Sequence, residues 1–172
     1  MQSTKCKRII DTLKNKDKIR ILFVCLGNIC RSPAAEALMA DTVERHGDAW
    51  RWEIDSAGIG SWHIGQLADK RMRVHAQRRG YTLTHRARQV SAIDFERFDI
   101  IIAMDAQNES DLRDLAPSPE ACDKIIRMNE FIDMTTRYDH IPDPYYEGAE
   151  GFELVLDLLE NGTENLHRLL TE

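Results

Sequence analysis

The chain alternates between short apolar runs and longer segments in which apolar residues recur at helical spacing. Short, bounded apolar runs are typical of buried strands, whereas recurrence every three to four residues is typical of a helix with one buried face. Buried strands are predicted at residues 21–25, 52–55, 99–104 and 124–128. Helices are predicted at residues 33–46, 69–79, 107–115 and 152–170, with a short one that follows Ser91 and ends at Phe98. The pair Asn161-Gly162 is expected to loosen the last helix midway.

This alternation of strands and helices predicts an α/β fold. Strands that are joined through helices pair in parallel, because each crossover returns the chain to the same edge of the sheet. We therefore expect three layers, in which a four-stranded parallel sheet is flanked by helices on both faces. Ligands of such sheets bind beyond the carboxyl ends of the strands, so the loop that begins at Cys25 is the first candidate for a site.

The first 18 residues precede the first predicted strand and are treated separately. They place Ile9, Ile10 and Leu13 on one side of a possible helix, among a local excess of basic residues. Short isolated helices are marginal in water, so the segment is expected to be either a frayed helix or a disordered tail. We assign residues 1–18 to an N-terminal extension and residues 19–172 to one domain.

Composition and charge exclude several classes of protein. The 172 residues include 23 Lys and Arg against 29 Asp and Glu, and the net charge of −6 disfavours nucleic-acid binding. The apolar runs are far shorter than the ~20 residues of a membrane span, and the basic N-terminus lacks the apolar core of a secretory signal. Four cysteines are too few for a disulfide scaffold of this size, so we expect a reducing compartment, the cytoplasm.

The strongest chemical signal is the segment that joins the first strand to the first helix. It reads Cys25-Leu26-Gly27-Asn28-Ile29-Cys30-Arg31-Ser32-Pro33. Backbone N–H groups that turn inward beside a helix N-terminus form a nest for phosphate or a similar oxyanion. Gly27 and Asn28 are the residue types that tolerate the positive φ expected in so tight a loop. Arg31 lies six residues after Cys25 and can close over the same anion.

Cys25, at the start of this nest, is the candidate nucleophile. Inward N–H groups, the helix dipole and Arg31 favour its thiolate, and Ser32 can donate a hydrogen bond to the sulfur. The alternative is a buried structural cysteine at the end of a strand. The complete segment between strand and helix favours the nucleophile.

A second chemical signal is Asp143, which has a proline on either side and is followed by Tyr145 and Tyr146. Attack on a phosphate monoester creates a poor leaving group, and a general acid can supply its proton. We interpret Asp143 as that acid, although Asp-Pro alone is typical of a plain turn. The two tyrosines are expected to form one wall of an aromatic slot, with Trp62 as the opposing wall.

These segments together resemble the low-molecular-weight protein tyrosine phosphatases. The stretch CLGNICRSP matches the phosphate-binding signature of that family, and the resemblance runs from about Ile19 to Leu170. Further matches are IDSAG at 54–58, SWHIG around Trp62, HRARQ at 85–89, AMD at 103–105, LRDL at 112–115 and DPYY at 143–146. The resemblance implies a flavodoxin-like fold of the phosphotyrosine phosphatase I-like type and the hydrolysis of phosphotyrosine.

The resemblance also implies a mechanism. Cys25 would attack phosphorus to form a cysteinyl-phosphate, Arg31 would stabilise the phosphoryl oxygens, and Asp143 would act first as general acid and then as base for water. No cofactor is implied, and no histidine stands at metal-ligand spacing from a cysteine, so we expect no metal. The substrate would be a phosphotyrosine-containing protein, with an autophosphorylated tyrosine kinase as one candidate, and the enzyme a monomer or weak dimer.

Residues around the loop receive supporting roles from the same resemblance. It implies that Asn28 is tied to Ser56 and His85, which would hold the strained loop. Cys30 lies in the same tight loop as Cys25, and the family resemblance supports a reversible disulfide between them. An inert Cys30 is the alternative.

Three other functions remain as alternatives. An arsenate reductase needs two further cysteines to relay oxidation, and only Cys122 lies beyond Cys30. A phosphoarginine phosphatase resembles this chain, but such relatives carry Thr at the position of Ile29, whose side chain cannot hydrogen-bond a guanidinium. A non-catalytic phosphotyrosine-binding module would lack the nucleophile or the acid, whereas Cys25 and Asp143 are both present.

Overall fold

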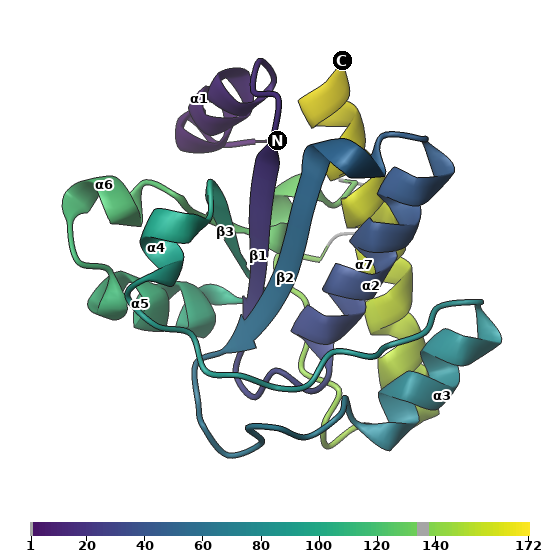
Figure 1. Cartoon of the computed structure of the whole chain (residues 1–172). Coiled ribbons are helices and arrows are strands. Elements are labelled where there is room, and N and C mark those ends of the chain that lie inside the picture. Colours follow the sequence, from purple (N-terminus) through teal and green to yellow (C-terminus); the bar gives the residue numbers. More distant parts are fainter. Residues whose placement is uncertain (1, 134–137) are drawn as a thin grey trace.

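The computed structural model describes residues 2–133 and 138–172, and its centre is one parallel sheet (Figure 1). The strands are β1 (Ile19–Cys25), β2 (Trp52–Gly58), β3 (Ile100–Ala103) and β4 (Ile125–Arg127). They form a four-stranded sheet in the order β2-β1-β3-β4, and every pair is parallel. The predicted four-stranded parallel sheet is confirmed.

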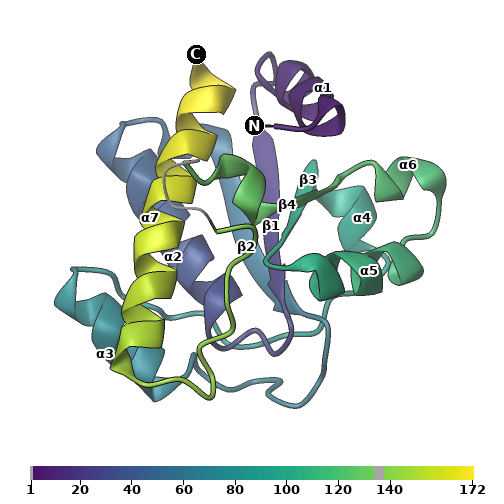
Figure 2. The same cartoon turned by 180° about the vertical axis from the view of Figure 1, so that it is seen from behind.

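Helices cover both faces of this sheet (Figures 1 and 2). The helices are α1 (Thr4–Leu13), α2 (Arg31–Arg45), α3 (Lys70–Arg78), α4 (Asp94–Arg97), α5 (Ala106–Leu115), α6 (Pro119–Cys122) and α7 (Ala149–Thr171), with short 3₁₀ turns η1 (Ala49–Arg51) and η2 (Met128–Phe131). Helices α2, α3 and α7 lie on one face and α4, α5 and α6 on the other, which confirms the three layers. In the described ranges no helix combines the length and apolarity that a bilayer crossing requires.

Strand β1 is buried on both faces because its side chains alternate between two cores. Ile21 and Phe23 belong to the larger core, between the sheet and helices α2 and α7. Leu22 and Val24 belong to the smaller core on the other face, which includes Phe98. A continuous apolar run is therefore what an inner strand of a three-layer fold requires.

The strand order brings three chain segments to one edge of the sheet. β1 pairs with β2 on one side and with β3 on the other, so the connections leave β1 in opposite directions at a switch point. Cys25 at the end of β1 is paired with Gly58 at the end of β2. Ala103 at the end of β3 is paired with Val24. Loops that follow these strands therefore meet around Cys25.

The N-terminal extension is a packed helix rather than a frayed or disordered one. In α1 the buried side chains are Cys6, Ile10 and Leu13, and Ser3 caps the helix by accepting a hydrogen bond from the backbone N–H of Cys6 at 3.1 Å. The sequence prediction counted Ile9, which is only partly buried, and missed Cys6. The helix lies near the amino end of β1, at the opposite edge of the sheet from Cys25 (Figure 1).

Helix α7 continues through Asn161-Gly162, so the expected loosening is wrong. Gly162 is buried, and a Cβ atom there would lie 2.5 Å from Cε of Met128 and 3.0 Å from Cδ1 of Ile132. The glycine therefore allows α7 to pack closely against the chain around η2. From the sequence alone, a glycine with this packing role cannot be distinguished from one that interrupts a helix.

Candidate active site

The loop from Cys25 to Arg31 joins the end of β1 to the start of α2 at the switch point. Cys25 is buried, Leu26 is the most exposed residue of the loop, and Asn28 is buried with a φ of 57°. Among the described residues other than glycine, Asn28 alone has a positive φ. The expectation of a positive φ holds for Asn28 and is wrong for Gly27.

The side-chain amide of Asn28 holds this loop in place. Its Nδ2 donates to Oγ of Ser32 at 2.8 Å and to Oγ of Ser56 at 3.0 Å. Its Oδ1 accepts from the backbone N–H of Arg88 at 3.0 Å and lies 2.9 Å from Nε2 of His85. These contacts join the loop to β2 and to the segment around residue 86, and they offset the cost of a left-handed backbone at a non-glycine residue.

The same contacts fix the tautomer of His85. The backbone N–H of Arg88 donates to Oδ1 of Asn28, which identifies that atom as the amide oxygen. An amide oxygen only accepts hydrogen bonds, so Nε2 of His85, 2.9 Å away, must carry a hydrogen. The other ring nitrogen, Nδ1, lies 3.1 Å from Oε1 of Glu36 and 3.4 Å from Oδ1 of Asp55. If the ring is neutral, Nδ1 presents a lone pair to the carboxyl groups of Glu36 and Asp55. One of these carboxyl groups must then be protonated to donate a hydrogen bond to Nδ1.

Of these three groups, Glu36 is the one best suited to carry that proton. Burial raises the pKa of Glu36 to about 7, with the charge of Asp55 adding to the shift and the hydrogen bond from Ser56 opposing it. Burial lowers the pKa of His85, although Asp55 acts against it. Glu36, Asp55 and His85 are also the one group in the described part of the chain whose ligand atoms, within 4.8 Å of one another, could hold a cation. Sequence reasoning missed Glu36, which resembles any other helical glutamate.

The sulfur of Cys25 lies where hydrogen bonds can stabilise a thiolate. Its Sγ is 3.0 Å from Oγ of Ser32 and accepts from the backbone N–H of Ser32 at 3.4 Å. The N-terminus of α2 adds partial positive charge beside it. Cys30, in contrast, is buried, and burial, followed by the charge of Asp69, raises the pKa of its thiol. Of the two loop cysteines, Cys25 is therefore the one suited to attack.

Arg31 is almost fully buried and is held by groups from two segments, one after β3 and one before α7. Its Nη1 donates to Oδ2 of Asp105 at 2.6 Å and to the carbonyl oxygen of Ile141 at 3.0 Å, and its Nη2 lies 3.6 Å from Oδ2 of Asp143. Burial acts to lower the pKa of Arg31, but Cys25, Asp105 and Asp143 outweigh it and the pKa lies above its ordinary value. From the sequence, Asp105 was expected at the end of the third strand on this edge, where a supporting role was open.

Asp143 lies in a tight turn before the two tyrosines. Its Oδ1 accepts from the backbone N–H of Tyr145 at 3.1 Å, a local bond that fixes the carboxylate relative to the chain. The rings of Tyr145 and Tyr146 meet edge to face, with centroids 4.9 Å apart. Tyr146 is 92% exposed, so this wall is open to solvent.

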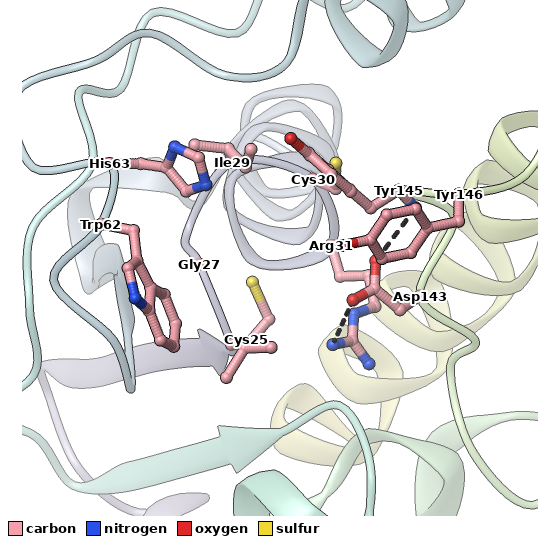
Figure 3. Close-up of a pocket in the computed structure, with 11 residues that line it drawn as sticks. Cys25, Gly27, Ile29, Cys30, Arg31, Trp62, His63, Asp143, Tyr145 and Tyr146 are labelled. Atoms are coloured by element: carbon pink, nitrogen blue, oxygen red, sulfur yellow. Dashed lines mark hydrogen bonds and ion pairs between the residues drawn. The ribbon is translucent and has the colours of Figure 1, made fainter.

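These residues line a cavity of about 320 Å³ above Cys25. In Figure 3, Trp62 and His63 lie on one side of the Cys25 sulfur, and Asp143, Tyr145 and Tyr146 lie on the other. The lining residues are Cys25, Leu26, Gly27, Ile29, Cys30, Arg31, Trp62, His63, Asp143, Tyr145 and Tyr146. Of the other predicted site residues, Asn28 belongs to the loop itself, and Ser32, Ser56 and His85 form hydrogen bonds with its side chain. His63 was missed, since a lone histidine in a loop carries no signal of its own.

Comparisons of the sequence and of the structure with known proteins point to the same group of phosphatases. Residues 20–172 match the family model described as low molecular weight phosphotyrosine protein phosphatase. The chain is 41% identical to the low molecular weight protein-tyrosine-phosphatase of Streptomyces coelicolor, over 86% of this chain and 90% of that protein. It is 45% identical to the crystal structure of a protein tyrosine phosphatase from Entamoeba histolytica with Hepes in the active site, with a TM-score of 0.85 over 88% and 96% of the two chains. The crystal structure of a Drosophila arginine phosphatase is 33% identical, with a TM-score of 0.81 over 87% and 96%.

Replacement of Gly58 by alanine should distort the loop. A Cβ atom at Gly58 would lie 3.0 Å from the backbone nitrogen of Asn28 and from the carbonyl carbon of Gly27, and backbone atoms cannot move aside cheaply. We expect Gly58→Ala to weaken the binding of inorganic phosphate or orthovanadate by roughly ten- to hundredfold. Gly148→Ala is the matched control, because nothing lies within 4 Å of its added Cβ. Equal affinities of Gly58→Ala and wild type, by calorimetry, would contradict this account.

The raised pKa of Glu36 predicts a pH-dependent stability. Its pKa rises from 4.5 to about 7 on folding, so its contribution is complete below about pH 4.5 and is lost as the pH rises through about 7. In Glu36→Gln the amide donates to His85 at every pH. Between pH 5 and pH 8 we expect wild type to lose roughly 1–3 kcal/mol of unfolding free energy relative to Glu36→Gln in urea titrations. Exposed Glu44→Gln is the control, and a pH-independent difference for Glu36→Gln would count against the shared proton.

Proposed function

We propose, for a chain that belongs to the low molecular weight phosphotyrosine protein phosphatase family, a reaction that passes through a phosphate ester of Cys25. The protein is an enzyme of the protein-tyrosine-phosphatase class, a phosphoric monoester hydrolase. The observation that carries the mechanism is that Cys25, Arg31 and Asp143 line one cavity. They are a nucleophile, a cation and a carboxyl group, which are the groups that phosphoryl transfer requires.

In the first step, the sulfur of Cys25 forms a bond to phosphorus as the bond from phosphorus to the tyrosine oxygen breaks. The leaving oxygen takes a proton from Asp143, so no phenolate is released. Arg31 and the inward N–H groups of the loop hold the three equatorial oxygens, whose charge must be stabilised in the transition state. The support for this assignment is the position of Asp143 beside Arg31, across the cavity from Trp62 (Figure 3).

In the second step, water attacks the phosphorus and gives its proton to the carboxylate of Asp143. The bond between phosphorus and sulfur breaks, inorganic phosphate forms and the thiolate of Cys25 returns. The hydroxyl of Ser32, 3.0 Å from the sulfur, can donate to it as negative charge builds on the leaving atom. At the end of the cycle Asp143 has regained its proton and Cys25 its thiolate, so the reaction needs no external cofactor.

Arg31 changes partners in this proposal. Before the substrate binds, its Nη2 lies 3.6 Å from the carboxylate of Asp143, while Asp105 and the carbonyl of Ile141 hold Nη1. A phosphate dianion competes with Asp143 for Nη2. Asp105 then keeps the guanidinium in place, and Asp143 is released to face the leaving oxygen.

The aromatic walls favour phosphotyrosine over shorter phosphorylated side chains. Trp62 and Tyr145 flank the cavity, and a flat phenyl ring can pack between such faces while its phosphate reaches the loop. A phosphorylated serine would leave the walls without contact. We propose phosphotyrosine-containing proteins as substrates, with an autophosphorylated tyrosine kinase as one candidate, and a reducing compartment such as the cytoplasm, where four free cysteines persist.

The roles of Cys25 and Asp143 can be tested with phenyl phosphate. We expect Cys25→Ser to lower kcat at least about 10⁴-fold, because the hydroxyl is not ionised at neutral pH. Asp143→Ala should lower kcat by roughly 10² to 10⁴-fold, the usual contribution of a general acid. Rapid-quench phosphopeptide mapping should find phosphate on Cys25. Full activity of Cys25→Ser, or phosphate on a different residue, would refute the mechanism.

A matched set of peptides with phosphotyrosine, phosphoserine or phosphoarginine at one position tests the substrate class. Phosphotyrosine should react at least about tenfold faster than phosphoserine. The similarity to an arginine phosphatase makes phosphoarginine the informative competitor, and Ile29 in the cavity lining offers no hydroxyl to its guanidinium. If phosphoarginine reacted fastest, the tyrosine assignment would be wrong.

We also propose Cys30 as a redox partner of Cys25. Peroxide converts the Cys25 thiolate to a sulfenic acid, which condenses with the Cys30 thiol to form a disulfide and release water. Both cysteines line the same cavity, which supports this pairing. The disulfide would protect Cys25 from irreversible oxidation.

Mild peroxide followed by peptide mapping tests this pair. Wild type should give a Cys25–Cys30 disulfide that dithiothreitol reverses with full recovery of activity. Cys30→Ala should give Cys25 sulfinic acid and irreversible loss. Sulfinic acid as the main product in wild type would exclude the protective role.

A further inference from the structure

Arg71, near the start of α3, joins that helix to the segment that carries Asp143. Its Nη2 donates to the backbone carbonyl oxygen of Tyr145 at 2.9 Å. Its guanidinium also lies between two rings, 5.4 Å from the centroid of Tyr145 and 4.8 Å from that of Phe152. The segment that leads into α7 passes the N-terminal end of α3 in both views (Figures 1 and 2), as these contacts require.

Asp69 fixes the position of Arg71. The carboxylate of Asp69, which caps α3, accepts from Nε of Arg71 at 3.0 Å and from its Nη2 at 2.8 Å, so the guanidinium is held by two parallel bonds. The backbone N–H of Asp69 in turn donates to the carbonyl oxygen of Ile29 at 2.8 Å. A continuous path of contacts therefore runs from the loop around Cys25 through Asp69 and Arg71 to Tyr145.

Tyr145 carries this restraint directly to Asp143. The backbone N–H of Tyr145 donates to Oδ1 of Asp143, and the carbonyl of the same residue accepts from Arg71. Residues 138–148 contain no helix or strand, so no ladder of backbone hydrogen bonds holds this segment. A displacement of Tyr145 would therefore also displace the carboxylate of Asp143 relative to Cys25.

We propose that Arg71 is a positioning residue that sets the place of the Asp143 carboxylate relative to the nucleophile loop, an inference that rests on the proposed role of Asp143 as general acid. Arg71 does not touch the reacting atoms. An arginine suits this task because one planar group can pair with a carboxylate, donate to a carbonyl and stack on rings at the same time. A lysine can make only part of these contacts.

The test separates the acid from the rest of the machinery by the leaving group. An aryl phosphate with a strongly acidic phenol, such as dinitrophenyl phosphate, needs little help from an acid, whereas phenyl phosphate, with a leaving group of pKa ~10 like that of tyrosine, needs a proton. We expect Arg71→Met to lower kcat/KM, which reports the steps up to release of the phenol, roughly tenfold for phenyl phosphate and less than about twofold for dinitrophenyl phosphate. The affinity for inorganic phosphate should not change.

Two further variants accompany Arg71→Met. Arg71→Lys keeps the charge and loses the paired contacts, so it should show the same leaving-group selectivity to a smaller degree, and it serves if Arg71→Met is unstable. Arg78→Met removes an exposed arginine from the same helix and should leave both rates unchanged. The double variant Arg71→Met/Asp143→Ala should discriminate between the two leaving groups no more than Asp143→Ala does. Arg71 acts only through Asp143, so its loss has no further effect on proton transfer once Asp143 is absent.

The outcomes distinguish this inference from the proposed function. Equal losses on both substrates, or no loss, in the Arg71 variants would overturn the positioning role while leaving Asp143 as the acid. A further selective loss in the Asp143→Ala background would overturn it as well. If Asp143→Ala itself showed no leaving-group selectivity, the general-acid assignment would fail and the inference with it.

Discussion

The buried amide of Asn28 is the contact on which the rest of the site depends. A loop that turns its N–H groups toward one centre cannot also pair them with its own carbonyl groups, so other parts of the chain must hold its shape. Asn28 does this with both ends of one side chain, through Ser32 and Ser56 on one end and Arg88 and His85 on the other. These hydrogen bonds also offset the conformational cost of the left-handed backbone at Asn28, whose φ is 57°. Loss of this amide would leave several buried polar groups without partners.

The parallel sheet supplies the second constraint, because it delivers different functions to the same edge from different strands. β1 ends at Cys25, and β2 brings Ser56 and Gly58 beside the loop. The chain after β3 provides Asp105, whose carboxylate caps α5 through the N–H of Asn108 and anchors Arg31. Asp143 alone among these side chains comes from a segment without helix or strand. Cys25 and Ser56 are thus placed by strands, whereas Asp143 relies on contacts with Arg31 and with the backbone of Tyr145.

The features that could be predicted from the sequence are those whose signals are local. A continuous apolar run identifies β1, the stretch CLGNICRSP identifies the loop, and prolines on both sides single out Asp143. Glu36 could not be predicted, since it becomes unusual only when the fold brings it to Ser56, 20 residues away, and to His85. Gly162 was misread for the same reason, because its meaning lies in the approach of Met128. The packing of α1 was also beyond local signals, since an isolated helix of that length is marginal without a surface to cover.

The two cores on either side of the sheet differ in size, and the smaller one supports α4, α5 and α6. Local stability follows the amount of apolar surface that a segment buries, and α5 buries only Asn108 and Leu112, far fewer side chains than α2 or α7. Asp105 is the first link between that layer and the pocket, since one of its oxygens caps α5 and the other holds Arg31. An opening of α5 that moved Asp105 would therefore leave the guanidinium of Arg31 to the carbonyl of Ile141 and the carboxylate of Asp143. The outer helical layer and the pocket thus share one carboxylate, which serves both as a helix cap and as an anchor of the guanidinium.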